Sequence, residues 1–186
     1  MPHLGLFSSI PGTGKSSLAN AIIKELNGEA MWINASLDRS VDVLRGKLLK
    51  FASQTSFDDK MKIVVMDEFD NFTADGQRAF RGFIDEFSDN CIFIFTGNFK
   101  EKIIPPMLDR LEVYDFTTFS KQDMVKPIFE RLQFILNNEG VTFDPKELIP
   151  VINTYYPSVR SMVGALQKYS DDGVFKVSES QLDNLD

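Results

Sequence analysis

The sequence predicts an α/β domain with a doubly wound, largely parallel five-stranded sheet flanked by helices, followed by a small domain of three helices. Five apolar segments alternate with amphipathic, helix-forming segments up to about residue 118. A glycine-rich turn joins the first apolar segment directly to the first helix-forming one. From Ser120 onward the pattern is that of helices alone. We therefore expect a core over residues 1–118 and a helical lid over residues 119–186.

The composition is typical of a folded domain with a net negative charge. Hydrophobic residues make up 43% of the chain, and no apolar run approaches the roughly 20 residues that span a bilayer. A net charge of −7 argues against a general affinity for nucleic acid and leaves a local basic face open. With one histidine and one cysteine there is no zinc site; we expect His3 at the surface and Cys91 in the core. Without a signal peptide pattern, a cytoplasmic location with no membrane partner is expected.

The first apolar segment, Leu4 to Phe7, leads into a phosphate-binding loop. The loop consists of Pro11, Gly12, Thr13, Gly14, Lys15, Ser16 and Ser17. Its glycines let the backbone wrap around an anion, and the N–H groups of the following helix N-terminus complete the cradle. In such a loop the lysine reaches the β- and γ-phosphates and the first serine contacts Mg²⁺. One position departs from the usual pattern, because Ser9 replaces its first glycine.

Two more elements follow before the next motif. The helix predicted from Ser16 to Leu26 is expected to bury Leu18, Ala21, Ile22 and Leu26. A second strand is expected from Ala30 to Ile33, with Trp32 packed in the core or at the sheet edge. A helix with Val41, Leu44, Leu48 and Phe51 on its inner face comes next.

The segment K-I-V-V-M-D-E-F-D, from Lys62 to Asp70, is a buried strand that ends in three carboxylates. Carboxylates at the carboxyl end of a strand face the crevice in which open α/β sheets bind ligands. We expect Asp67 to hold Mg²⁺, directly or through water, and Glu68 to polarise an attacking water. An acidic loop after a strand is the alternative for this segment in isolation, and its position after the phosphate loop favours the functional interpretation.

The remaining core elements carry one further candidate. A helix from about Thr73 to Ser88 is expected to bury Phe80, Phe83 and Phe87 and to carry Gln77, Arg78 and Arg81 outside. The uncharged strand C-I-F-I-F-T-G then ends at Asn98. Beside a phosphate loop, an asparagine there can hold the water opposite the γ-phosphate, and a turn-forming asparagine is the alternative. A short helix that begins with Ile103-Ile104-Pro105-Pro106 precedes the fifth strand, Leu111 to Phe116.

Three helices are predicted for the lid. Ser120 caps the first with Asp123, and Pro127 is expected to kink or restart it. Asp144 caps the second. The third, from about Ser158 to Tyr169, carries Arg160 in its first turn.

These motifs together resemble AAA+ ATPases, in particular sliding-clamp loader small subunits of the replication factor C type and those of T4-like phages. The resemblance covers His3 to about Lys176 and includes P-G-T-G-K-S, V-V-M-D-E-F-D, T-G-N, L-D-R and Y-Y-P-S-V-R-S. It implies that Asn98 is sensor 1, that Arg160 is sensor 2 and that Arg110 is an arginine finger acting in trans. It also implies that Gln77 relays DNA contact to Glu68. Arg39 and Ser40 lie in a polar loop before a helix N-terminus, so we expect them to face the DNA backbone, which resembles the arrangement in related loaders.

The function implied is an Mg²⁺-dependent ATPase, stimulated by DNA and clamp, that places a sliding clamp on primer-template DNA. It would work in a hetero-oligomeric ring with other clamp-loader subunits, in the host cytoplasm if phage-encoded. The alternatives are another AAA+ replication ATPase such as a helicase loader, and a nucleotide-binding interaction subunit with little hydrolysis. Where loaders usually carry Ser-Arg-Cys, this chain has Asp109-Arg110-Leu111, so Asp109 is expected to neutralise the finger in part. The usual adenine-covering segment and the collar are missing from these 186 residues, so nucleobase specificity and self-assembly stay open.

Overall fold

The structure, a computed structural model, describes residues 2–36, 41–54 and 60–177 and divides into two compact units. The first unit comprises Met1–Ser9 and Lys15–Thr117, and the second comprises Ile10–Gly14 and Thr118–Asp186. The turn of the phosphate loop is thus grouped with the C-terminal unit. Among the described residues, no helix combines the length and the apolar character that crossing a membrane requires.

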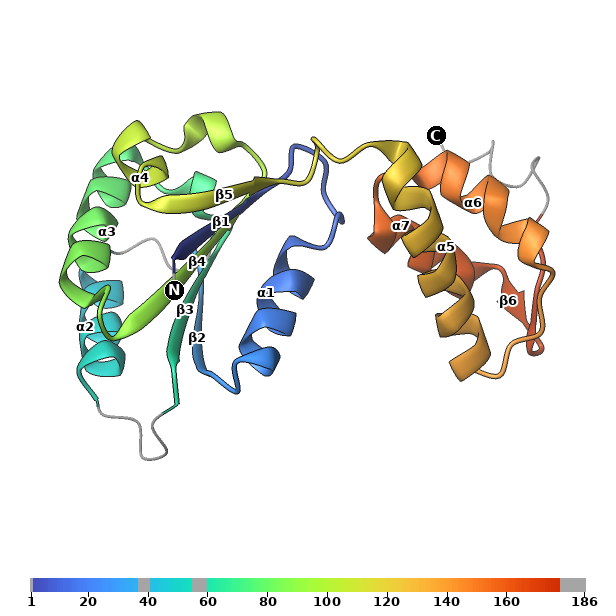
Figure 1. Cartoon of the computed structure of the whole chain (residues 1–186), viewed down its shortest axis with the longest axis horizontal. Coiled ribbons are helices and arrows are strands. Elements are labelled where there is room, and N and C mark those ends of the chain that lie inside the picture. The colour runs from blue at the N-terminus through green and yellow to red at the C-terminus, as the bar shows by residue number, and fades with distance from the viewer. Residues whose placement is uncertain (1, 37–40, 55–59, 178–186) are drawn as a thin grey trace. The chain divides into compact units, whose positions relative to one another are not determined.

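The first unit is a five-stranded sheet with helices on both faces, which confirms the predicted fold class (Figure 1). The strands lie in the order β2-β3-β4-β1-β5, and all four neighbouring pairs are parallel. Its elements are β1 (His3–Phe7), α1 (Lys15–Glu25), β2 (Glu29–Asn34), α2 (Val41–Ser53), β3 (Lys62–Asp67), η1 (Phe69–Asn71), α3 (Ala74–Phe87), β4 (Cys91–Gly97), η2 (Lys100–Lys102), α4 (Pro105–Leu108) and β5 (Leu111–Asp115).

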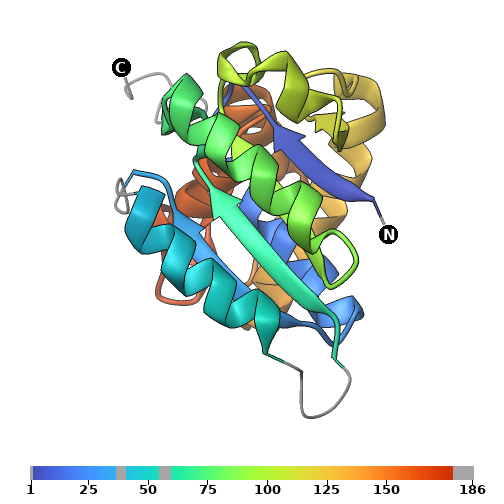
Figure 2. The ribbon, with the colours of Figure 1, turned by 90° about the vertical axis from the view of Figure 1, so that its left-hand side faces the viewer.

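Helix α1 covers one face of this sheet, and α2 and α3 cover the other (Figures 1 and 2). Strand residues alternate between the faces, so Leu6 and Val65 pack on the α1 side while Phe7 and Met66 pack on the other. The second face holds the predicted phenylalanines of α3, all of them buried: Phe80, Phe83 and Phe87. Because the central strands are covered on both faces, they read as nearly continuous apolar runs.

The buried face of α1 differs from the one predicted. Leu18 and Ala21 are exposed, whereas Ala19 is buried and a partly buried set packs with it: Ile22, Ile23 and Leu26. Positions 19, 22, 23 and 26 follow the spacing i, i+3, i+4 and i+7, which puts them on one helical face. The helix has apolar residues on two overlapping faces. The face that packs on the sheet is the one whose residues keep the i, i+3, i+4, i+7 spacing.

The predicted surface position of His3 is wrong, because its side chain is only 9% exposed. Strand β1 lies between β4 and β5, so its first residue is interior. The His3 Nδ1 atom accepts a hydrogen bond from the Phe93 N–H at 3.2 Å, and the ring packs edge-on against Phe93. Trp32, by contrast, lies on the edge strand β2 and is 41% exposed.

The described residues of the second unit, 10–14 and 118–177, form three α-helices around an apolar core of their own and a small hairpin that the sequence analysis did not predict. The predicted caps are confirmed at Ser120, which begins the first of these helices, and at Asp144, which begins a short 3-10 helix that leads into the second; each accepts a backbone N–H. Ser158 caps the third helix in the same way. Pro127 lies inside a helix that continues past it, so the helix does not restart there. The elements are α5 (Lys121–Asn138), η3 (Pro145–Glu147), α6 (Leu148–Tyr155), α7 (Val159–Lys168), β6 (Ser170–Asp171) and β7 (Val174–Phe175).

Candidate nucleotide-binding site

Three neighbouring parallel strands bring the candidate residues of the first unit to one edge of the sheet. Strand β4 pairs with β1 on one side and with β3 on the other. The phosphate loop follows β1, Asp67 ends β3, and Asn98 follows β4. Because parallel strands end at the same edge, side chains that are remote in sequence meet there.

Lys15 and Asn98 are in direct contact. The Lys15 Nζ donates to Asn98 Oδ1 at 2.9 Å and lies 3.5 Å from the Ser8 carbonyl oxygen. The lysine is half-buried in the first turn of α1, and Ser17, two residues further on, is exposed. The amide oxygen of Asn98 is therefore oriented by a cation of the phosphate loop, which a residue serving only as a turn former does not require.

Ser16 and Asp67 form the second contact at this edge. The Ser16 hydroxyl donates to Asp67 Oδ1 at 3.2 Å, and the hydroxyl of Thr96 donates to the same oxygen. Among the described residues there is no group of three or more histidine, cysteine, aspartate or glutamate side chains that could hold a metal. A hydroxyl and a carboxylate fit Mg²⁺ in a site whose remaining ligands are phosphate oxygens and waters.

Glu68 has a left-handed backbone and a side chain held by Ser36, which lies just beyond the end of the neighbouring strand β2. Its φ and ψ are 57° and 39°, a conformation that few residues with a side chain adopt. The Ser36 hydroxyl donates to Glu68 Oε2, and the Asn71 amide donates to Ser36 Oγ at 2.8 Å. Sequence reasoning missed Ser36 and Thr96. The available signal was a hydroxyl residue at or just beyond the end of a strand.

Asp70, the third acid of the motif, lies beneath the same edge. It is 6% exposed, and its Oδ2 accepts the Phe99 N–H at 3.2 Å, which holds the backbone next to Asn98. Its Oδ1 has no hydrogen-bond partner in the described part of the chain. A Cβ atom at Gly97 would lie 2.8 Å from that oxygen, so only glycine fits there.

The predicted outer-face position of Gln77 is wrong, because the side chain is 1% exposed. Its Nε2 donates to the carbonyl oxygens of Phe72 and Lys102 at 3.1 and 3.0 Å, and its Oε1 accepts the Ile104 N–H at 2.8 Å. A buried amide of this kind is stable only when its donors and acceptor are paired. Gln77 therefore connects α3 by hydrogen bonds to Lys102 and Ile104, which precede α4.

Arg110 pairs with Asp85 of α3, a partner that the sequence analysis did not predict. Its Nε and one terminal nitrogen donate to the two Asp85 oxygens at 2.6 and 2.9 Å. These hydrogen bonds hold the pKa of Asp85 below its ordinary value and raise that of Arg110, to which Asp109 adds a smaller electrostatic contribution. The sequence neighbour is thus the minor partner.

The turn of the phosphate loop, in the second unit, is held by the start of α7. Gly12 and Gly14 have φ values of 79° and 103°, a region that suits glycine. The Gly12 carbonyl oxygen accepts the Arg160 N–H at 3.1 Å. Pro11 is exposed, and the Thr13 hydroxyl is buried without a partner among the described residues. Such an orphaned polar atom suits a ligand that brings its own oxygen atoms.

The side chain of Arg160 is exposed and makes no hydrogen bond to the residues that the structure describes. Arg39 and Ser40, the predicted DNA contacts, lie outside the described residues.

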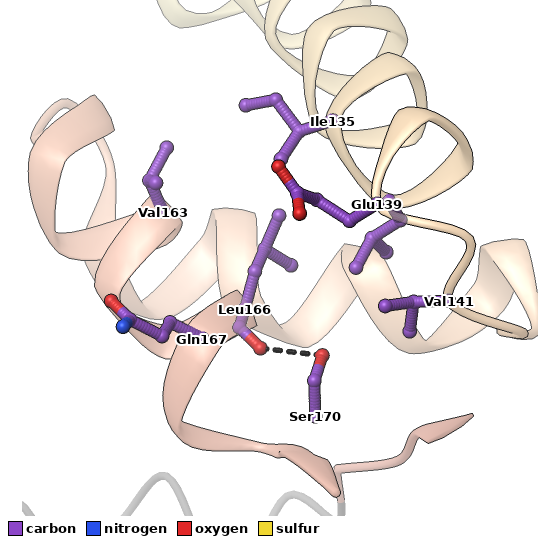
Figure 3. Close-up of a pocket in the computed structure, with 8 residues that line it drawn as sticks. Ile135, Glu139, Val141, Val163, Leu166, Gln167 and Ser170 are labelled. Carbon is purple, nitrogen blue, oxygen red and sulfur yellow. Dashed lines mark hydrogen bonds between the residues drawn. The ribbon is translucent and has the colours of Figure 1, made fainter. Parts of the chain in front are cut away.

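The second unit also holds a cavity of about 420 Å³ (Figure 3). Apolar side chains of α5 and α7 line most of it, with Glu139 and Gln167 among its polar groups. The Ser170 hydroxyl in its wall donates to the Leu166 carbonyl oxygen at 2.7 Å. None of the predicted site residues lines this cavity.

Residues 5–118 match the family described as ATPase family associated with various cellular activities (AAA). The sliding-clamp-loader large subunit of Enterobacteria phage T4 is 38% identical over 179 residues, which cover 94% of this chain and 56% of that protein. The replication factor C small subunit of Aeropyrum pernix is 36% identical over 189 residues, covering 95% of this chain and 57% of that protein. The chain thus spans little more than half the length of these relatives.

Among solved structures, the Thermotoga maritima RuvB Holliday junction branch migration motor is similar with a TM-score of 0.74. The match covers 98% of this chain and 60% of that one. At 14% sequence identity, the likeness concerns the fold alone.

Proposed function

The chain belongs to the AAA family of ATPases, and from this premise we propose that it is an ATP-binding and hydrolysing subunit of a DNA polymerase sliding-clamp loader. One observation carries the proposal. Side chains suited to binding a nucleotide contact one another at one sheet edge, Lys15 with Asn98 and Ser16 with Asp67, in a chain 38% identical to a phage clamp-loader subunit. In this proposal residues 1–118 are the ATPase core and residues 119–186 the lid.

The residues present fit ATP with Mg²⁺. The loop from Pro11 to Ser17 would surround the phosphates with backbone N–H groups, and Lys15 would move from Asn98 toward the β- and γ-phosphates. Ser16 and Asp67 would hold Mg²⁺, which supplies charge neutralisation on the phosphate oxygens when bound. The hydrogen bond between these two residues supports this assignment, because a metal ligated by both needs them adjacent.

Hydrolysis is assigned to groups around the same edge. Glu68 would polarise the attacking water, and Asn98 would orient that water opposite the γ-phosphate. Arg110 would act on the nucleotide of a neighbouring subunit, where an arginine supplied in trans stabilises the charge that develops on the phosphoryl oxygens. Arg160 would contact the nucleotide of its own chain, in keeping with its exposed side chain at the start of α7.

The partners would be a sliding clamp, primer-template DNA and further clamp-loader subunits in a ring, in the cytoplasm. Arg39 and Ser40 are proposed to face the DNA backbone. The buried position of Gln77 supports a relay, since its amide joins α3 to the residues before α4 and α3 begins shortly after Glu68. Differential affinity of the ATP and ADP states for clamp and DNA would drive loading and release.

Two alternatives stay in competition: another AAA replication ATPase such as a helicase loader, and an interaction subunit that binds nucleotide and hardly hydrolyses it. The presence of Lys15, Asp67, Glu68 and Arg110 favours hydrolysis. ATP turnover measured alone, with primed DNA, and with DNA plus a sliding clamp separates the three. Turnover that rises with DNA and rises further with clamp supports the loader. Turnover indifferent to the clamp, or absent in every mixture, contradicts it.

A further inference from the structure

The Arg110 guanidinium is fixed by one carboxylate and one carbonyl. Its Nε and NH2 donate to Asp85 Oδ1 and Oδ2 at 2.6 and 2.9 Å, and its NH1 donates to the Pro106 carbonyl oxygen at 2.8 Å. A paired carboxylate and guanidinium of this bidentate kind share one plane. Rotation about the terminal bonds of the arginine is therefore restricted before any ligand arrives.

These hydrogen bonds use only some of the N–H groups of the Arg110 guanidinium. Arginine has five N–H donors, and three of them are engaged here. Within the described residues, one N–H on NH1 and one on NH2 have no acceptor. These two terminal nitrogens can bind two oxygens of one phosphoryl group, which is the geometry in which arginine binds phosphate best.

Helix α3 holds the segment from Ile104 to Arg110 at two places. Gln77 accepts the Ile104 N–H, and eight positions later Asp85 holds Arg110. At 1.5 Å per residue these anchors are about 12 Å apart along the helix. Between them, Met107 is fully buried, so the short helix α4, which ends just before the arginine, is fixed as well. The segment is therefore oriented by α3 as well as by its own hydrogen bond from Arg110 to Pro106.

Stability alone does not account for the pair. The Arg110 and Asp85 side chains are 31% and 50% exposed, and an ion pair in water contributes little to the free energy of unfolding. The main effect of the pair is to orient the Arg110 side chain. A long side chain that is not already held loses rotamer freedom when it binds a ligand, and this loss weakens binding.

We propose that Asp85 is a positioning residue for Arg110, which it presents to a phosphoryl group bound by a neighbouring subunit. The inference rests on the proposed function in one respect, that Arg110 acts in trans. Asp85 itself touches no nucleotide. It raises the fraction of Arg110 side chains that already point their two remaining N–H groups outward.

The test uses two chains that each lack one half of the site. An acceptor chain with Arg110→Ala keeps its phosphate loop, and a donor chain with Lys15→Ala keeps its arginine. Donor is titrated into a fixed amount of acceptor, with mixed assembly verified by sedimentation, and both plateau turnover and half-saturating donor concentration are measured. Adding Asp85→Ala to the donor should lower the plateau about 10- to 100-fold and leave the half-saturating concentration unchanged.

Matched variants separate positioning from a structural role. Asp85→Glu in the donor keeps a carboxylate and should recover part of the plateau. Asp75→Ala removes another exposed ion pair of α3, with Arg78, and should change neither quantity. In the isolated chain, the Arg110 Nε–H should give a sharp NMR signal that is lost in Asp85→Ala.

Three outcomes would contradict the positioning role of Asp85. An unchanged or higher plateau with Asp85→Ala, a shift in half-saturating concentration alone, or no protected Nε–H signal in the parent chain overturns the inference. In the first two cases the proposed function stands if the parent donor still activates. If the parent donor fails to activate in a verified mixed assembly, the trans role of Arg110 is wrong and both proposals fail together.

Discussion

The backbone N–H of Arg160 donates to the carbonyl oxygen of Gly12 at 3.1 Å, so the first turn of α7 holds the turn of the phosphate loop. The approach is close enough that a Cβ atom at Gly12 would lie 2.5 Å from Ser158 Oγ and 2.9 Å from Arg160 Cβ. Gly14 differs, because a Cβ atom there would meet nothing within 4 Å. The two glycines are therefore required for different reasons.

Gly12→Ala should weaken nucleotide binding more than Gly14→Ala. Both substitutions force alanine into a positive φ, at a cost of about 1–2 kcal/mol, and only Gly12→Ala adds a steric clash with the start of α7. Titration with a fluorescent ATP analogue gives the affinities, and urea denaturation gives the free energies of unfolding. Equal losses of affinity would show that the contact with α7 does not shape the loop.

Glu68→Gln should bind ATP normally and turn over poorly. The amide keeps the size of the side chain but cannot accept the proton of the attacking water, so turnover should fall about 10²- to 10⁴-fold. Lys15→Ala removes a phosphate contact and should weaken binding itself. Dissociation constants and single-turnover rates of both variants distinguish these effects. A similar loss of affinity in both would exclude Glu68 as the base.

The stability of the first unit should fall in mild acid because of His3. Burial lowers the pKa of His3 from its ordinary value of 6.5, and protonation would also remove the acceptor of the Phe93 N–H. Between the folded and unfolded pKa values the unfolded chain binds the extra proton. The contribution of His3 to the free energy of unfolding is therefore complete above about pH 6.5 and is lost as the pH falls through the folded pKa.

Urea denaturation of the parent chain and of His3→Asn between pH 8 and pH 5 measures this effect. Asparagine does not titrate, so its curve should fall less steeply below pH 6.5 than that of the parent. Parallel curves would mean that the folded and unfolded chains bind the His3 proton equally.

Lys62→Met should destabilise the first unit by about 1–3 kcal/mol. Lys62 is 5% exposed and donates to the carbonyl oxygens of Phe51 and Gln54, at the C-terminal end of α2. Methionine preserves the apolar stem and leaves these oxygens without a donor. The urea midpoint measures the loss, and Lys50→Met, on an exposed position of the same helix, should shift it little. Equal midpoints for the two variants would contradict a capping role for Lys62.

Local patterns in the sequence determined the order of the elements and the principal residues of the site. The glycines and lysine of the phosphate loop, and Asp67 and Glu68 at the end of an apolar run, are recognisable because each pattern lies within a few residues of chain. Strand order was not needed for these assignments. Carboxyl ends of parallel strands meet at one edge in any order.

Only the tertiary structure decided which distant side chains meet. Strand order β2-β3-β4-β1-β5 sets Thr96 beside Asp67, and the end of β2 brings Ser36 to Glu68. Helical periodicity placed Gln77 outside, yet the residue is buried because three backbone groups pair its amide. Arg110 likewise takes Asp85 over its neighbour Asp109. The physical reason is shared: spacing along a chain predicts the face on which a residue lies, whereas a polar side chain settles where its hydrogen bonds are satisfied, and those partners are supplied by the packed fold.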